Sequence, residues 1–302
     1  MPEAPPWRIP GGSAHRPYLI GADQVDVVNA ALRLRRPLLV TGRPGSGKSS
    51  LARAIADDLG LGPVLTWPVN TRSTLGEALY RYDAIGRLRE QQMGDYQEQA
   101  RDVGHYIRLG PLGTALATQH HGLPRLLLID ELDKSDIDLP NDLLVVLEEG
   151  RFEIPELSRL PDEQQQDGVA VGVAGSHELH LVRDGVVRCV EFPFVLITSN
   201  GEREFPPAFL RRCVRLELPY PDEKQLTEIV RAHFATEREP DGARQWEQIT
   251  ELIREFVARR TLRELATDQL LHAVHLLRQD VRPDDHLREA VLSELGDSAR
   301  PG

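Results

Sequence analysis

The sequence has very few cysteines and no excess of positive charge. Its 302 residues include only two cysteines, Cys189 and Cys213, which form neither a disulfide framework nor a metal-ligand spacing. We therefore expect a cytoplasmic protein. Lys and Arg number 36 against 47 Asp and Glu, for a net charge of −11. This acidic balance argues against a general nucleic-acid-binding surface, although it leaves room for a small basic channel.

Long hydrophobic runs are also missing. The longest apolar runs, such as 37–40 and 126–129, are far too short to cross a bilayer, so no membrane association is expected. The N-terminal MPEAPPWRIPGG has no apolar signal-peptide core. It is typical of a Pro/Gly-rich flexible tail, which we expect to cover residues 1–16.

Short apolar segments alternate with helical patterns over the next two hundred residues. Leu51, Ile55 and Leu59 lie on one face of a predicted helix over 49–59, and Leu143, Leu144 and Leu147 mark another that ends at Gly150. Alternation of this kind predicts an α/β fold with a parallel sheet. The five predicted strands cover residues 37–41, 64–69, 125–129, 194–198 and 214–218.

The strand signal stops after residues 219–221. Asp222 and Gln225 have the spacing of a capping box, and periodic apolar residues continue through Leu277. We therefore expect residues 221–302 to form a small all-helical domain.

Two segments interrupt the alternation. Residues 86–110 are polar and rich in Arg and Gln, where a second helix should lead into the third strand. Residues 156–188 begin with a polar loop and end in a predicted hairpin, whose strands 179–183 and 186–190 flank the turn Asp184-Gly185.

A phosphate-binding loop is predicted at residues 42–49. The run GRPGSGKS matches G-x-x-x-x-G-K-[ST] and lies between a strand and a helix, as such a loop requires. Its backbone N–H groups and the helix N-terminus would face phosphate oxygens. Lys48 would reach the β- and γ-phosphates, and the Ser49 hydroxyl would hold Mg²⁺. The predicted nucleotide-contacting residues are Gly42, Pro44, Gly45, Ser46, Gly47, Lys48, Ser49 and Ser50.

A second acidic motif follows the strand at 125–129. Asp130 and Glu131 end the hydrophobic run LLLIDE, at the carboxyl edge of the same predicted sheet. Asp130 would bind Mg²⁺ through water, and Glu131 would act as the general base toward an attacking water. The alternative is that both carboxylates only serve the N-terminus of the next helix. Paired with the phosphate loop, they predict hydrolysis.

The strand at 194–198 also ends in polar residues. If this strand lies between those leading to Gly42 and to Asp130, Asn200 comes close to the γ-phosphate. Its amide would orient the attacking water together with Glu131. Otherwise Asn200 only turns the chain before Gly201.

These motifs together resemble those of an AAA+ ATPase, and within that superfamily those of the MoxR-like branch. The resemblance spans about residues 18–280 and implies a P-loop NTPase with a three-layer parallel-sheet core at 17–220 and an all-α lid at 221–302. It also implies a helix-2 insertion within 72–112 and a pre-sensor-1 hairpin region at 156–190. It rests on the P-loop together with LLLIDELDK, ITSN, FLRRC, YRYD, GPL and LPNDLL.

The segment FLRRC, residues 209–213, contains an arginine pair that could cap a helix, hold a phosphate or grip nucleic acid. The resemblance implies instead an arginine finger acting on a neighbouring subunit's nucleotide. Arg212 is the first candidate and Arg211 the second, since a guanidinium can stabilise charge on the γ-phosphate. In the lid, the resemblance implies a cis sensor-2 arginine at Arg263, with Arg259 and Arg260 as alternatives.

The resemblance implies Mg²⁺-dependent ATP hydrolysis in a homo-oligomeric ring, expected to be a hexamer. It further implies remodelling of a partner protein, which in such systems often carries a von Willebrand A domain. ATP is favoured over GTP because no guanine-specifying motif is visible. Two alternatives remain: a nucleic-acid-directed or restriction-type AAA+ motor, which the acidic charge disfavours, and a monomeric P-loop kinase, which Glu131 and Asn200 disfavour.

Overall fold

The computed structural model describes residues 5, 17–92, 103–234, 243–260 and 265–279. The expected N-terminal tail, apart from residue 5, and Arg263 lie outside these described residues. Contacts divide the chain into two compact units. One contains Met1–Gln24, Gly42–Ala54 and Glu217–Gly302, and the other contains Val25–Thr41 and Ile55–Leu216.

The second unit is built on a five-stranded sheet. Its strands lie in the order β13-β1-β12-β7-β2, and β1, β12, β7 and β2 pair in parallel. Ile197 at the centre of β12 pairs with Leu39 of β1 on one side and Ile129 of β7 on the other. This confirms that β12 separates the strand leading to the P-loop from the strand leading to Asp130. The strands are β1 (Leu38–Thr41), β2 (Leu65–Pro68), β7 (Leu126–Asp130), β12 (Phe194–Ser199) and β13 (Val214–Glu217), each within one residue of its predicted bounds.

Helices accompany these strands in the alternating order that the sequence predicts. The β7 residues Leu126–Ile129 are fully buried, as expected for a strand covered on both faces. α6 ends where Gly150 adopts a left-handed conformation with φ 62° and donates its N–H to Val146 O. The fold is therefore an α/β P-loop arrangement with a central parallel sheet. The helices are α1 (Ala22–Leu34), α2 (Lys48–Leu59), α5 (Pro111–Ala117), α6 (Leu139–Glu149) and α9 (Pro207–Leu210).

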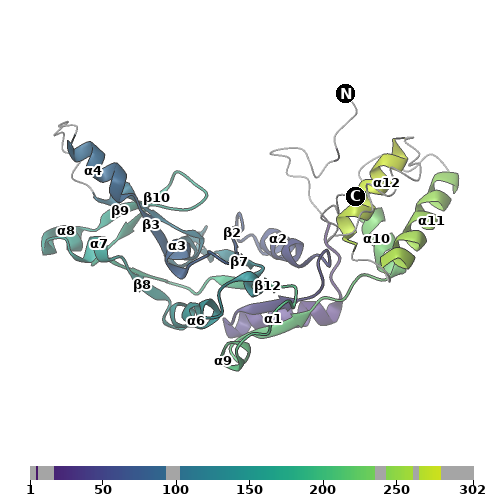
Figure 1. The fold of residues 1–302 in the computed structure, drawn as a ribbon, viewed down its shortest axis with the longest axis horizontal. Coiled ribbons are helices and arrows are strands. Elements are labelled where there is room, and N and C mark those ends of the chain that lie inside the picture. The colour runs from purple at the N-terminus through teal and green to yellow at the C-terminus, as the bar shows by residue number, and fades with distance from the viewer. Residues whose placement is uncertain (1–4, 6–16, 93–102, 235–242, 261–264, 280–302) are drawn as a thin grey trace, which may run out of the picture. The chain divides into compact units, whose positions relative to one another are not determined.

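A second sheet is built from β4, β9 and β10, which lie in the two segments that interrupt the alternation, and from β3, which lies just before the first of them. Its strand order is β10-β9-β4-β3, and β4 meets β9 where Arg108 pairs with Gly172. Figure 1 shows these strands together with α4 and α7. The elements are α3 (Leu75–Leu79), β3 (Tyr80–Tyr82), α4 (Ala84–Gln92), η3 (Val103–Tyr106), β4 (Ile107–Leu109), α7 (Pro155–Ser158), α8 (Asp162–Asp167), β9 (Val169–Gly172) and β10 (Leu179–Val182).

The predicted hairpin at 179–190 is wrong except for its turn. Asp184 and Gly185 do turn the chain, with φ values of 54° and 65°, and Arg183 and Val186 form one bridge. Beyond it β10 pairs with β9, whereas β11 (Val186–Arg188) pairs with β8 (Arg151–Glu153). The turn also contacts the residue that follows β8, because Ile154 N donates to Gly185 O. Each strand therefore finds a different partner. The short pair β5 (Gln119–His120) and β6 (Leu123–Pro124) completes this unit's strands.

Three helices dominate the described part of the other unit, as the sequence predicts. α10 (Glu223–Phe234), α11 (Ala243–Arg260) and α12 (Thr267–Arg278) pack around a common apolar core, which contains Leu226, Ile253 and Leu270. Figure 1 shows the three helices side by side. The expected capping box is present: Gln225 N donates to Asp222 Oδ1 at 2.7 Å, and Asp222 N donates to Gln225 Oε1 at 3.0 Å. No helix in the described ranges is long and apolar enough to span a membrane.

Candidate nucleotide-binding site

The P-loop follows β1 directly and has the backbone of a phosphate cradle. Gly45 and Gly47 have φ values of 76° and 93°, which glycine adopts readily and other residues rarely do. A Cβ at Gly45 would lie 2.4 Å from Cα of Ala266, and a Cβ at Gly47 would lie 3.3 Å from the Tyr18 ring. Burial raises the pKa of Tyr18 to about 12. The glycines therefore allow both an unusual backbone and close packing around it.

Lys48, the first residue of α2, reaches back across this loop. Its Nζ donates to Gly42 O at 2.7 Å and to Arg43 O at 3.0 Å, and the side chain is buried. Ser49 and Ser50 follow in the first turn of α2. The Oγ of Ser46 is buried without a hydrogen-bond partner among the described residues. A buried hydroxyl left unsatisfied beside a glycine cradle fits a loop that takes an anion with several oxygens.

Asp130 lies at the end of β7 and is oriented from the neighbouring strand. Thr198, fully buried in β12, donates its hydroxyl to Asp130 Oδ1 at 2.7 Å. The hydroxyl oxygen of Thr198 accepts the N–H of Glu131 at 2.8 Å. One hydroxyl thus holds the side chain of Asp130 and the backbone of Glu131. Asp130 carries a carboxylate, the type of oxygen ligand that Mg²⁺ uses alongside phosphates and water.

Glu131 is held in an uncommon backbone conformation, with φ 60° and ψ 48°. Its Oε1 accepts from Asn200 Nδ2 at 3.3 Å, and its Oε2 pairs with Lys134 Nζ at 2.8 Å. The hydrogen bond to Glu131 is the main cause of the raised pKa of Lys134. The structure therefore brings the predicted base and Asn200 together, as expected. It adds a cation, Lys134, to which the sequence analysis assigned no role.

Asp133 is a further residue to which the sequence analysis assigned no role. It is 4% exposed, and its Oδ2 accepts the N–H groups of Asn200 at 2.9 Å and Glu202 at 3.1 Å. Arg203 then donates to Ser135 Oγ at 3.3 Å. The short helix η4 (Leu132–Lys134) and the loop after β12 are therefore docked on each other. The only sequence signal for Asp133 was its place within IDELD.

The arginine pair of FLRRC lies just beyond α9. Arg211 is exposed and only caps this short helix through its backbone. Arg212 forms an ion pair with Glu148 of α6, and its Nη1 donates to Ala208 O at 3.1 Å. Because α6 and α9 belong to the same unit, contacts within that unit position the Arg212 side chain.

The lid arginines differ from one another in their surroundings. Arg259 pairs with Glu255 one turn earlier, with 2.6 Å between Nη2 and Oε1. Arg260 is 8% exposed and donates to Thr267 Oγ1, whose hydroxyl donates to Gly45 O. Burial lowers the pKa of Arg260 from its ordinary value. Arg263, the first choice for sensor 2, lies outside the described residues. Thr267, which the sequence analysis overlooked, is a side chain of α12 that is bonded to the P-loop.

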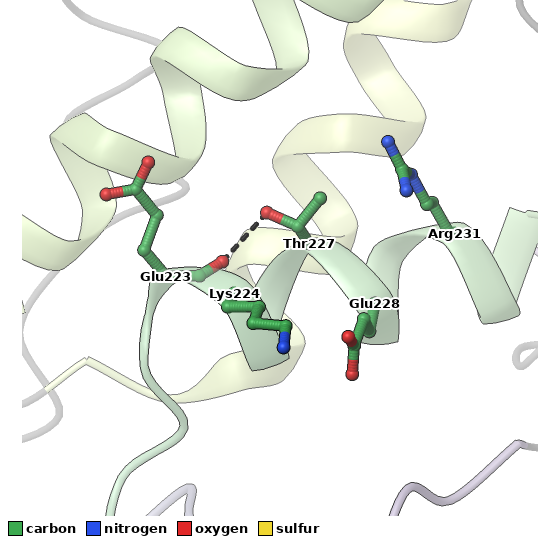
Figure 2. A pocket seen from close by; sticks show the side chains of 5 residues that line it. All are labelled: Glu223, Lys224, Thr227, Glu228 and Arg231. Atoms are coloured by element: carbon green, nitrogen blue, oxygen red, sulfur yellow. Dashed lines mark hydrogen bonds between the residues drawn. The ribbon is translucent and has the colours of Figure 1, made fainter.

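One open pocket lies on α10, away from these motifs in the sequence. Figure 2 shows its lining residues, all on this one helix, with Thr227 donating to Glu223 O at 2.8 Å. Its lining is mostly charged and contains none of the predicted site residues, as is typical of ordinary helix surface. The lining residues are Glu223, Lys224, Thr227, Glu228 and Arg231.

The central parallel sheet, the P-loop after β1 and the acidic end of β7 define a P-loop NTPase fold of the AAA+ class. Residues 37–213 match the AAA domain (dynein-related subfamily), and the chain belongs to this family. No curated protein sequence matches it significantly.

Two similar solved structures are the FIGL-1 AAA domain in complex with ADP and NtrX from Brucella abortus in complex with ADP. The first is 17% identical with a TM-score of 0.41, covering 84% of this chain and 64% of its own. The second is 15% identical with a TM-score of 0.44, covering 91% of this chain and 54% of its own. This chain therefore matches less than two thirds of either protein's chain.

Proposed function

We propose that this protein binds ATP with Mg²⁺ and hydrolyses it, and that it works as a subunit of a MoxR-like ring that remodels a partner protein. The observation that carries the proposal is the contact between Glu131 Oε1 and Asn200 Nδ2 at the carboxyl ends of adjacent strands. A carboxylate and an amide in contact can accept a proton from one water molecule and orient it at the same time. Membership of the AAA family supports nucleotide chemistry for this site.

In the proposed reaction, Lys48 and the P-loop amides hold the phosphates of ATP. Ser49 and Asp130 would hold Mg²⁺, which neutralises charge on the phosphate oxygens. Glu131 takes a proton from the attacking water, whose oxygen bonds to the γ-phosphorus. The bond between the γ-phosphorus and its bridging oxygen breaks, which releases ADP and phosphate. Thr198 and Asp133 keep the two polar strand ends aligned. Lys134 forms an ion pair with Glu131 Oε2 and so orients this carboxylate.

Arg212 from a neighbouring subunit would stabilise charge on the γ-phosphate. Its guanidinium is already ordered by Glu148 and the carbonyl of Ala208, which reduces the entropy lost when it engages a phosphate. Arg211 is the weaker candidate, because it is exposed and only its backbone has a described contact. A partner carrying a von Willebrand A domain remains part of the MoxR-like proposal.

The first test is Mg²⁺-dependent phosphate release by the purified full chain, with Lys48→Ala and Glu131→Gln as inactive controls. The second mixes Lys48→Ala with Arg212→Ala, both inactive alone. If Arg212 acts in trans, interfaces that pair an intact P-loop with an intact arginine regain part of the activity. Absence of recovery from two folded, assembled variants would overturn the trans role.

A nucleic-acid-directed motor is the alternative function. Stimulation of phosphate release by DNA or RNA, lost as salt concentration rises, would favour it over the remodelling function. Unchanged hydrolysis in the presence of both nucleic acids would support the remodelling proposal.

A further inference from the structure

The tip of the P-loop is bonded to side chains that lie more than 170 positions away in the sequence. Thr267 Oγ1 donates to Gly45 O at 3.1 Å, and Thr267 N donates to the same oxygen at 3.4 Å. Tyr220 Oη donates to Pro44 O at 3.3 Å. Both consecutive carbonyls at the tip are therefore held, one by the first residue of α12 and one by the segment before α10. All these residues belong to the same compact unit.

Arg260 is buried behind these contacts. Its guanidinium carbon lies 4.5 Å from the centre of the Tyr220 ring and 4.5 Å from that of Phe256, so two aromatic faces enclose it. Its Nη1 donates to Pro221 O at 3.2 Å and its Nη2 to Thr267 Oγ1 at 3.2 Å. No carboxylate among the described residues pairs with it. This buried guanidinium is therefore held by two aromatic faces and two neutral oxygen acceptors.

The direction of the Thr267 hydroxyl follows from the chemistry of Arg260. A guanidinium can only donate hydrogen bonds, so Thr267 Oγ1 must accept from it. The single hydroxyl proton is then left for Gly45 O. Arg260 thus orients the hydroxyl of Thr267 so that it donates to Gly45 O, although Arg260 itself makes no described hydrogen bond to the P-loop.

We propose that Arg260, Thr267 and Tyr220 form a latch that orients the P-loop peptides for nucleotide, with Arg260 as a positioning residue that acts through Thr267. The peptide between Pro44 and Gly45 is planar and trans, so fixing Pro44 O also fixes the opposite direction of the Gly45 N–H. The bonds to Gly45 O fix the next peptide in the same way. Amides ordered before the phosphate arrives lose less entropy on binding.

The latch also links the lid to the nucleotide. Ala266, the N-cap of α12, leaves no room for a side chain at Gly45. A shift of α12 would therefore change the hydrogen bonds and the packing at the loop tip together. This inference deepens the proposed function and rests on it as far as nucleotide is concerned.

The test compares Thr267→Val with Thr267→Ser in the full chain. Valine keeps the shape of threonine and removes the hydroxyl, whereas serine keeps the hydroxyl. In the nucleotide-free protein, hydrogen exchange of the amides at 43–47 should be faster in Thr267→Val and unchanged in Thr267→Ser. The dissociation constant for a fluorescent ATP analogue should rise about fivefold in Thr267→Val only, the size expected from one hydrogen bond.

Two further variants separate the parts of the latch. Tyr220→Phe keeps the ring against Arg260 and removes only the bond to Pro44 O, so we expect a weaker version of the Thr267→Val effect. Arg260→Lys keeps the positive charge but loses the two guanidinium N–H groups that donate to Pro221 O and Thr267 Oγ1, so it should weaken nucleotide binding as Thr267→Val does. A thermal melt with each variant checks that the fold is retained.

The outcomes distinguish the latch from the proposed function. If the unchanged protein binds no ATP analogue, the proposed function fails. The existence of the latch is then tested by the hydrogen-exchange comparison alone. If the exchange of 43–47 in Thr267→Val equals that of the unchanged protein, or if Thr267→Ser is as impaired as Thr267→Val, the latch is overturned. Faster exchange with unaltered affinity would equally overturn its role in nucleotide binding.

Discussion

Thr198 Oγ1 donates to Asp130 Oδ1 at 2.7 Å while accepting the N–H of Glu131 at 2.8 Å. This hydroxyl lies in the central strand of the sheet and is fully buried. It connects the two acidic residues at the end of β7 to the strand that leads to Asn200. The proposed metal ligand and the proposed base therefore depend on one side chain that contacts no substrate in the proposal.

Replacing Thr198 should remove the hydrogen bonds that hold Asp130 and Glu131 in their positions. We expect Thr198→Val to lower the free energy of unfolding by about 1–3 kcal/mol, because a partly buried carboxylate oxygen and a partly buried N–H lose their partner. The turnover number should fall about tenfold as Asp130 and Glu131 become misaligned. Thr198→Ser, which keeps the hydroxyl, is the matched control. Urea unfolding and steady-state kinetics measure both effects, and full activity in a folded Thr198→Val would contradict the alignment role.

Asp133 should be needed for the position of Asn200. In Asp133→Ala two backbone N–H groups lose their acceptor, which should cost about 2–3 kcal/mol of stability. The turnover number should fall while the Michaelis constant for ATP changes little, because Asn200 acts on the water rather than on nucleotide binding. Asp133→Asn keeps one acceptor oxygen and should recover most of the stability. Equal losses in the two variants would argue against the acceptor role.

Glu148 should matter for hydrolysis more than for stability. The side chains of Arg212 and Glu148 are 33% and 54% exposed, so their ion pair should contribute no more than about 0.5 kcal/mol to folding. Glu148→Ala should nevertheless lower ATP turnover several-fold, less than Arg212→Ala does, because Arg212 is no longer held in place. Glu149→Ala is the neighbouring control. Parallel thermal melts and phosphate-release assays separate the two effects, and an unaltered turnover in Glu148→Ala would contradict a positioning role.

Cys213 should behave as an inert core thiol. Burial raises its pKa from the ordinary 9.0 to about 12, which keeps it protonated at neutral pH. It should therefore resist alkylation in the folded protein and react only after unfolding, as mass spectrometry of the labelled chain would reveal. Rapid labelling of Cys213 in the native state at pH 8 would contradict its burial.

The same pKa shift gives a stability effect with a definite sign. Between about pH 9 and pH 12 the unfolded thiol loses its proton while the folded thiol keeps it, so the free energy of unfolding falls as pH rises. Between pH 8 and pH 10, Cys213→Ala should show a smaller fall in the free energy of unfolding, as measured by urea titrations at these two pH values.

Much of the fold was predictable because it depends on local patterns. Continuous apolar runs defined β1 and β7, and the capping box at Asp222 and Gln225 marked the start of α10. The P-loop was recognisable because glycines are needed at fixed positions where the backbone has positive φ. The hairpin prediction at 179–190 failed because a local turn does not decide which strands pair. That choice depends on β8 and β9, which pair with β11 and β10 and take the place that each strand of the hairpin would have had beside the other.

The amino-acid sequence alone determined the residues that carry the proposed chemistry: Lys48, Ser49, Asp130, Glu131 and Asn200. Their types and spacing follow from what phosphate, Mg²⁺ and water require. Only the tertiary structure decided which other residues hold them. Thr198 and Asp133 became meaningful once β12 was placed beside β7, and Thr267 once α12 met Gly45, 222 positions away. Such supporting contacts leave no periodic trace, because they arise from the packing of surfaces that are distant in the chain.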